Sequence, residues 1–495
     1  MKFTKALILI FTVSFITTSC FKDDDDNQIS ASSINDFVWK GMNTFYLYKN
    51  NIPNLANDRF TSNITYVDYL NSHSSPEDLF ESLIHQRETV DKYSWIVDDY
   101  IALEQLFSGV STSNGMEFKL FLEPNSSTKV IGIVRLVLAN SDAENKGLKR
   151  GDVFNAINGT PLTTNNYSRL LASNSYKINL ATYNTNNTSE TSDDTVASKN
   201  ESITLNKLQY SENPIYKTKV ITVKGENVGY LMYNGFTANY DSQLNAAFAN
   251  FKANNVKHLI LDLRYNPGGA VNSAILLSSM ITGQFNGEIF STEAWNTEFQ
   301  TFFENQNPEL LINRFTNNNK GTALNSLNLQ KVYILATDAS ASASELVINS
   351  LDPYINVIHI GDFTTGKYQA STTLYDSDDF GREGANPNHA YAMQPLIFKS
   401  LNKVGNTDYD NGLTPDIQIK ESYTNLGVLG DENETLLAAA LANIEGSIIK
   451  LETIKSKSKP FLKSIKDSNS FEPFNNEMHV EKKLPTDLKR RNFNE

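Results

Sequence analysis

The spacing of apolar and polar residues changes along the chain and divides it into four parts. Residues 34–98 carry aromatic and apolar side chains at helical spacing, which predicts a helical N-terminal domain. Residues 99–215 show shorter, strand-like runs and predict a mainly β domain. Residues 216–445 alternate strands with helices, which predicts an α/β domain whose sheet is covered by helices. Residues 446–495 are rich in Lys and Ser and then charged, so we expect a weakly ordered tail.

Single elements of the α/β part can be placed from the same pattern. Strands are expected at 228–233, 258–263 and 331–337, where apolar residues run continuously. Helices are expected at 241–254, which has apolar residues at i, i+3, i+4 and i+7, and at 270–281. In the β part, strands are expected at 116–122 and 129–138, and the polar stretch 183–202 is expected to be a mobile loop.

The strongest candidate for chemistry lies between residues 339 and 367. Alternating Ala and Ser follow the strand 331–337 and lead into a helix, and the stretch ends at Gly366-Lys367. A serine on such a turn lies at a helix N-terminus, where unpaired N–H groups and the dipole favour developing negative charge. Ser342 is therefore the candidate nucleophile. Because no His has a suggestive position, Lys367 is the candidate base, and burial must lower its pKa by about three units to make it neutral.

A second turn, Asn266-Pro-Gly-Gly269, follows a predicted strand and precedes a predicted helix. Backbone N–H groups on such a turn can point at a ligand oxygen. The N–H groups of Gly269 and Ala343 would then form an oxyanion hole, in which each donor contributes about 3 to 4 kcal/mol. Each piece also has a purely structural explanation: a helix cap, a turn or a solvated lysine.

Composition excludes several classes of function. The net charge is −13 and no basic cluster is present, so we expect no nucleic-acid partner. The chain has one cysteine, Cys20, which rules out an intrachain disulfide and a thiolate metal site. The six His residues lack ligand-like spacing. We therefore expect no metal and no cofactor.

The N-terminus predicts export. Residues 1–20 have a basic start, a short apolar core and small residues before Cys20, as in a signal peptide. The cysteine position resembles a bacterial lipobox, which implies lipidation of Cys20 and a lipid anchor in the outer membrane of the cell envelope. Residues 21–33 contain an acidic cluster that resembles the export signal of Bacteroidetes surface lipoproteins and predicts a tether. An ordinary secretory signal with an incidental cysteine is the alternative.

Residues 139–159 resemble part of a PDZ domain, with a small helix, Gly-Leu, Arg-Gly-Asp, a strand and an Asn-Gly turn. Such a domain binds a peptide as an added strand and holds its terminal carboxylate in a backbone nest. The candidate nest comprises four consecutive residues: Gly115, Met116, Glu117 and Phe118. Glu117 stands where the second glycine of the common Gly-x-Gly form would be.

Three motifs together resemble the carboxyl-terminal processing (tail-specific) serine peptidases. They are Asp262-Leu-Arg-x-Asn-Pro-Gly-Gly269, Ser340-Ala-Ser-Ala-Ser-Glu345 and Gly366-Lys367. The resemblance places the nucleophile three residues before the Glu, at Ser342, the lysine at Lys367, and the oxyanion hole at Gly269 and Ala343. It implies an α/β fold of the crotonase-like (ClpP/crotonase) ββα-spiral type, preceded by a helical domain and a PDZ domain. Where many members have a lysine-orienting Gln, this chain has Ser371, with Gln369 two residues earlier.

The resemblance implies a serine endopeptidase with a Ser-Lys dyad. Its substrates would be unfolded or C-terminally exposed proteins and peptides outside the cytoplasm, cut near the C-terminus with help from the PDZ domain. A catalytically inactive peptide-binding or scaffold lipoprotein on the same fold is the alternative. A third possibility is a tethered peptide receptor in which only the PDZ domain has a function.

Overall fold

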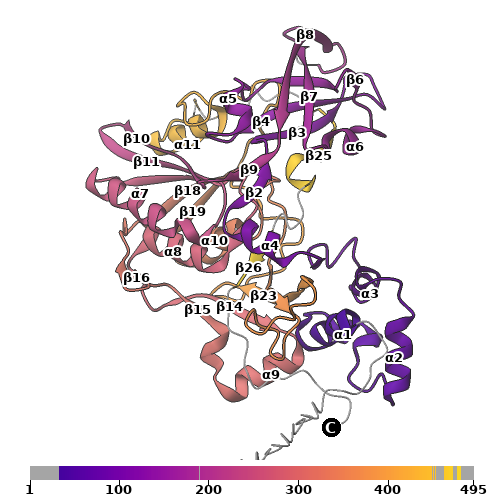
Figure 1. The fold of residues 1–495 in the computed structure, drawn as a ribbon. Coiled ribbons are helices and arrows are strands. Elements are labelled where there is room, and N and C mark those ends of the chain that lie inside the picture. The colour runs from indigo at the N-terminus through magenta and orange to yellow at the C-terminus, as the bar shows by residue number, and fades with distance from the viewer. Residues whose placement is uncertain are drawn as a thin grey trace, which may run out of the picture.

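The computed structural model describes residues 33–188, 190–448, 450, 452, 462–471 and 477–480. A β domain lies at one end, a helix-covered sheet in the middle, and the N-terminal helices at the other end (Figure 1). The predicted signal segment 1–20, with Cys20, lies outside the described residues. None of the helices described is both long and apolar enough to span a bilayer.

The N-terminal part is helical, as the sequence predicts. Its helices are α1 (Ser33–Phe45), α2 (Asn63–Asn71) and α3 (Pro76–Ser82). Ser62 and Ser75 each accept a backbone N–H from the first turn of the helix that follows, which fixes where α2 and α3 begin. The buried face of α1 belongs to the same hydrophobic core as the central sheet. The N-terminal helices are therefore packed onto the α/β part and share its core.

The β domain is built on one sheet. Its strand order is β25-β3-β4-β5-β7-β8, with bounds β25 (Ser464–Asp467), β3 (Met116–Leu122), β4 (Val130–Val137), β5 (Val153–Ile157), β7 (Ser175–Asn184) and β8 (Thr195–Asn206). The predicted strands at 116–122 and 129–138 are present. The predicted loop at 183–202 is wrong for half of its residues, because the strands β7 and β8 of a long hairpin include 183–184 and 195–202. Most residues of β8 are exposed, so this strand has no apolar alternation that could reveal it.

The central sheet has the strand order β10-β11-β12-β18-β19-β24 and is parallel from β11 onward. Its strands are β10 (Ile215–Val223), β11 (Glu226–Tyr233), β12 (His258–Asp262), β18 (Lys331–Ala336), β19 (Asn356–Gly361) and β24 (Ile417–Gln418). Helices α7 (Asp241–Ala253), α8 (Val271–Thr282) and α10 (Ala343–Leu351) cover one face, and α11 (Thr435–Glu445) covers the other (Figure 1). Leu259 and Leu261 join the first core and Ile260 the second, so both faces of β12 are buried.

A second mixed sheet lies beside the first and contains part of the C-terminal segment. Its strand order is β13-β26-β20-β23-β14-β15. Its strands are β13 (Gly269–Ala270), β26 (Met478–His479), β20 (Gln369–Ser371), β23 (Leu396–Leu401), β14 (Ile289–Trp295) and β15 (Ile312–Arg314). The expectation of a weakly ordered tail over 446–495 therefore needs correction at β25 and β26. These strands are two to four residues long, and they form by pairing with strands of the domains they contact.

Candidate active site

Ser342 lies on the turn between β18 and α10, and its neighbours fasten this turn to the one that follows β12. The Oγ of Ser340 donates to the Leu263 carbonyl at 2.7 Å, and the N–H of Ala341 donates to the Asn266 carbonyl at 3.1 Å. Ser344 Oγ donates to that same carbonyl at 3.0 Å. Ser340 and Ser344 therefore stabilise the turn through these hydrogen bonds, and Ser342 is the serine of this motif that remains for another role.

The backbone of Ser342 is strained. Its φ is +63° and its ψ is −114°, a region that residues other than glycine rarely adopt, and its side chain is buried. Strain of this kind costs about 1 to 3 kcal/mol and persists only where the surrounding structure enforces it. Strained backbone gathers at functional sites, so the observation supports a special role for Ser342.

Gly268 lies very close to Ser342, and Gly269 follows it on the same turn. Both have positive φ, +116° and +130°. A Cβ added to Gly268 would lie 2.6 Å from Ser342 Cβ and 2.8 Å from its Oγ. Only glycine fits at this position, and the backbone of this turn therefore lies directly against the serine hydroxyl.

The two predicted oxyanion donors directly follow the residues in contact, Ala343 after Ser342 and Gly269 after Gly268. Ala343 is the first residue of α10, so its N–H has no acceptor within the helix. Phe236 pairs with Gly269 through the Gly268 carbonyl and the Ala270 N–H. In a parallel ladder this leaves the N–H of Gly269 itself on the opposite edge, toward β26.

Glu345 joins the turn of Ser342 to the loop that carries Lys367. Its Oε2 accepts the N–H of Ser342 at 2.7 Å and the N–H of Lys367 at 2.9 Å. Its Oε1 accepts the N–H of Gly366 at 2.7 Å and the Oγ1 hydroxyl of Thr364 at 2.5 Å. Burial raises the pKa of Glu345, and these hydrogen bonds lower it. The effect of burial is larger, and the resulting pKa is about 7. This carboxyl group fixes Ser342 and Lys367 relative to each other.

The side chain of Lys367 is completely buried. Its Nζ lies 3.3 Å from Glu477 Oε2 and 4.9 Å from the centre of the Tyr93 ring. Burial lowers the pKa of Lys367, and the nearby charge of Glu477 opposes part of this shift. The net direction is the one that a lysine acting as a base requires.

The two residues expected to support the lysine have different partners. Gln369 Nε2 donates to the hydroxyl of Tyr48 at 3.1 Å. Ser371 Oγ donates to Glu477 Oε2 at 2.7 Å, and this is the oxygen that Lys367 approaches. Ser371 is therefore linked to Lys367 through Glu477.

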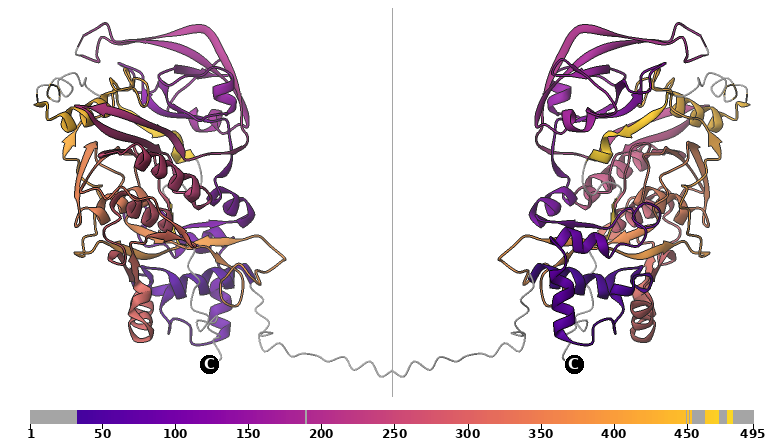
Figure 2. Two further views of the ribbon diagram at one scale, coloured as in Figure 1. Left: turned by 90° about the vertical axis from the view of Figure 1, so that its left-hand side faces the viewer. Right: turned by 90° about the vertical axis from the view of Figure 1, so that its right-hand side faces the viewer.

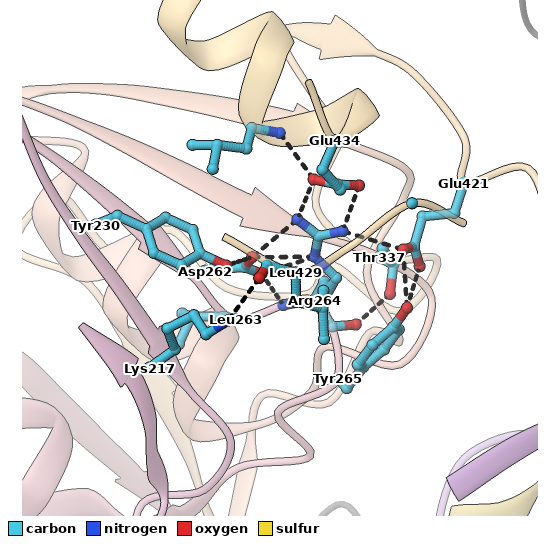
Figure 3. A network of polar contacts seen from close by, with 12 residues as sticks. Lys217, Tyr230, Asp262, Leu263, Arg264, Tyr265, Thr337, Glu421, Leu429 and Glu434 are labelled. Atoms are coloured by element: carbon cyan, nitrogen blue, oxygen red, sulfur yellow. Dashed lines mark hydrogen bonds and ion pairs between the residues drawn. The ribbon is translucent and has the colours of Figure 1, made fainter. Parts of the chain in front are cut away.

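A buried ionic network anchors the turn that bears the glycines (Figure 3). Arg264 is completely buried and forms ion pairs with Asp262, Glu434 and Glu421. Glu434 also accepts the Leu437 N–H at the start of α11. The Asp-Leu-Arg motif of the sequence therefore ties the end of β12 to the segment before α11, and so fixes the position of Asn266-Pro-Gly-Gly269.

The predicted nest of the β domain opens into the same cleft as the glycine turn. A cavity of about 250 Å³ is lined by Met116 and Glu117 at one side and by Gly268 and Gly269 at the other. Three nest residues already donate their backbone N–H groups to side chains. Gly115 donates to Ser113, Met116 to Asn114, and Phe118 to Ser468. The Glu117 carboxylate pairs with Arg135 at 3.0 Å.

Two protein-family models match the sequence of this chain. The model of peptidase family S41 matches residues 227–419, and the model of the peptidase S41 N-terminal domain matches residues 33–95. The chain belongs to peptidase family S41. The first match contains Ser342, Lys367 and the glycine turn, and the second contains α1 to α3.

Curated S41 relatives match about half of this chain. It is 26% identical over 225 residues to a CtpA-like serine protease of Staphylococcus epidermidis, covering 45% of this chain and 40% of the relative. It is 24% identical over 229 residues to a carboxyl-terminal-processing protease of Picosynechococcus, covering 46% and 48%. The chain thus spans less than half the length of these relatives.

A solved S41 protease from Bacteroides fragilis has a similar fold over most of the chain. It is 26% identical, with a TM-score of 0.62, and the match covers 83% of this chain and 97% of the solved one. The mixed α/β architecture with a helical N-terminal region is therefore that of an S41 protein. The PDZ identity and the crotonase-like spiral stay predictions.

Sequence reasoning used Glu345 only as a motif position, without assigning it a role, and missed Glu477 altogether. The role of Glu345 could have been found, since it lies three residues into the helix that begins at Ser342 and is therefore placed to accept N–H groups at its start. Glu477 gave no signal, because it lies 110 residues after Lys367 in a part of the chain without a pattern. No group of three or more His, Cys, Asp or Glu suited to a metal ion occurs among the residues that the structure describes.

Proposed function

We propose that this S41 chain is a serine endopeptidase that cuts proteins or peptides outside the cytoplasm near their C-terminus. The observation that carries the proposal is the shared carboxylate: Glu345 binds the backbone of both Ser342 and Lys367. A strained buried serine at a helix N-terminus and a buried lysine are thereby fixed in one site.

In this mechanism, neutral Lys367 removes the proton of Ser342 Oγ as the oxygen attacks the substrate carbonyl carbon. The negative charge that forms on the carbonyl oxygen is bound by the N–H groups of Gly269 and Ala343, each worth about 3 to 4 kcal/mol. The protonated lysine returns its proton to the leaving amine. In the second half of the reaction, Lys367 removes a proton from water as the water oxygen attacks the acyl carbon. The bond from this carbon to Ser342 Oγ breaks, and Lys367 returns the proton to Oγ.

We further propose that the β domain binds the substrate tail and that Cys20 carries the lipid anchor. The β domain would bind the tail as a strand added to β3, and the cavity that Met116 and Glu117 share with Gly268 and Gly269 supports this proposal. The lipid on Cys20 would tether the enzyme to the outer membrane.

A non-catalytic peptide-binding protein is the second candidate. One observation favours it: the amine of Lys367 contacts the acid Glu477, whose charge stabilises the protonated lysine. A lysine that keeps its proton cannot act as a base.

The test is cleavage of an unfolded reporter with a free apolar C-terminus by the chain that begins at Cys20. Ser342→Ala and Lys367→Ala are each expected to abolish cleavage. Ser202→Ala on β8 and Lys403→Ala, both on exposed side chains, are expected to leave it unchanged. Slower cleavage of the same reporter with an amidated terminus would support capture of the carboxylate. Binding of the tail without cleavage, alike in all variants, would establish the non-catalytic alternative.

A further inference from the structure

The C-terminal segment of the chain lies in the active site as a β-strand. β26 is inserted between β13 and β20 and runs parallel to both, with Met478 opposite Gly269 and His479 opposite Ser371. The N–H of Val480 donates to the Ser371 carbonyl at 3.0 Å. Strand addition of this kind is a common way for a protein to hold an extended peptide. β26 therefore occupies a position suited to a substrate strand.

The backbone of Glu477 lies against Gly268, the glycine that also lies against Ser342. The site that a Cβ on Gly268 would occupy is 2.8 Å from Ser342 Oγ and 2.9 Å from the Glu477 carbonyl oxygen. Both oxygens therefore lie close to the same glycine. The edge of Gly269 that bears its N–H also faces β26. Glu477 therefore lies beside the two glycines that a substrate carbonyl would have to approach.

The side chain of Glu477 also contacts the base. Its Oε2 is 3.3 Å from Lys367 Nζ, and both residues are buried. A carboxylate at this distance stabilises the protonated lysine, which is the form that cannot accept a proton from Ser342. The backbone of Glu477 thus lies beside the glycine turn at Ser342, and its side chain stabilises the protonated form of Lys367.

An earlier stretch of the same segment contacts the β domain. β25 pairs antiparallel with β3, the strand whose first residues belong to the predicted nest (Figure 2). Ser468 Oγ accepts the N–H of Phe118 at 3.1 Å, and Asp467 pairs with the buried Arg135. The Phe471 ring packs near the Phe118 ring, 6.1 Å between centroids. This is the edge where a tail-binding domain of the proposed kind would add a peptide.

We propose that the chain's own C-terminal segment, through β25 and β26, is a built-in competitive ligand of both peptide-binding positions. Proteolysis then requires displacement of this segment by the substrate or by a partner. The effect on proteolysis rests on the proposed function. Whether the segment occupies the two peptide-binding positions can be tested by binding alone. A covalently attached segment has an effective concentration of the order of millimolar, so a free peptide competes poorly with it.

The binding test uses the whole chain with Ser342→Ala, so that no cleavage occurs. The probe is a fluorescent peptide with the sequence of residues 474–483. Met478→Asp places a charge at a fully buried position of β26, and Glu477→Gln removes the negative charge beside Lys367 while keeping the shape. Both are expected to raise the affinity for the probe at least tenfold. The matched controls, Val404→Asp at a 75% exposed position and Glu309→Gln in an exposed ion pair, are expected to change nothing.

Equal affinity in all variants would overturn the inference. If Met478→Asp fails to fold, as shown by its thermal unfolding, the isosteric Glu477→Gln decides the question. Cleavage of the wild-type chain after Glu477, absent in Ser342→Ala and found by mass spectrometry, would also overturn it, since the segment would then be a substrate.

Activity separates this inference from the proposed function. With Ser342 intact, Glu477→Gln and Met478→Asp are expected to raise kcat/KM on the reporter at least tenfold if both ideas hold. Tighter probe binding with no cleavage in any variant supports the built-in ligand and refutes the peptidase. Cleavage with unchanged probe binding supports the peptidase and refutes the built-in ligand.

Discussion

The Nζ of Lys367 lies 3.3 Å from Oε2 of Glu477, and the two residues are 110 positions apart in the chain. Burial lowers the pKa of Lys367 and raises the pKa of Glu477, while each attracts the charged form of the other. The basicity of the candidate catalytic lysine therefore depends on an acid that the C-terminal segment supplies.

Glu477→Gln is expected to move the rising limb of the pH–rate profile to lower pH. Neutral Lys367 is the active form, so kcat/KM rises with pH through the lysine pKa and is level above it. The charge of Glu477 raises that pKa, and its removal leaves the lowering by burial unopposed. The measurement is kcat/KM from pH 6 to pH 11 for the wild type, Glu477→Gln and the control Glu309→Gln. A limb that stays in place or moves to higher pH contradicts the assignment of Lys367 as base.

Glu345→Gln is expected to lower both stability and kcat. The carboxylate of Glu345 accepts N–H groups on both oxygens, and a glutamine must turn its NH₂ toward donors on one side. A buried donor left without an acceptor costs about 1 to 3 kcal/mol. Urea unfolding measures the loss of stability, and single-turnover cleavage measures the loss of rate. If Glu345→Gln keeps full activity, the shared carboxylate does not position Ser342 and Lys367.

Gly268→Ala is expected to abolish activity. This loss is expected to be larger than backbone strain alone would cause. The added Cβ would lie 2.6 Å from Ser342 Cβ, so the serine or the turn must move. Gly225→Ala is the matched control, since Gly225 has φ +85° and open space around its Cβ position. It carries only the conformational cost of about 1 to 2 kcal/mol. Equal activity in the two variants would show that the close approach of Gly268 to Ser342 has no role in catalysis.

Much of the fold could be predicted from the sequence, because burial leaves a pattern. The strand at 258–263 and the helix at 241–254 have apolar residues where the sheet and the core require them, and both are present within one residue of the expected bounds. The family motifs likewise led to S41. The β8 strand and the two C-terminal strands were missed, since partner strands stabilise them and their own residues carry no apolar alternation.

The site was predicted in its local parts and missed in its long-range ones. Ser342 and Gly269 lie on turns that glycine, small residues and flanking strands indicate. The contact between Lys367 and Glu477 depends on how a distant segment enters the second sheet, and no spacing in the sequence encodes that. The roles of Ser342 and Lys367 themselves stay predictions that the variants above test.

Arg264→Met is expected to destabilise the fold by about 3 to 5 kcal/mol, because it leaves Asp262, Glu421 and Glu434 as buried acids without their common partner. Arg314→Met is the matched control, since its ion pair with Glu309 is exposed and worth about 0 to 1 kcal/mol. Denaturant unfolding of both variants at pH 7 gives the comparison.

The same network predicts how stability depends on acid. Burial raises the pKa of Glu421, but Arg150 and Arg264 outweigh it and hold this pKa at about 2. The folded pKa lies below the ordinary value of 4.5, so Glu421 contributes stability above pH 4.5 that is lost as the pH falls toward 2. In Arg264→Met, which keeps only Arg150 beside Glu421, the folded pKa of Glu421 must lie closer to 4.5, so the loss of stability is smaller and is complete at a higher pH. If wild type and Arg264→Met lose stability in parallel from pH 5 to pH 2, the arginine does not hold Glu421 ionised.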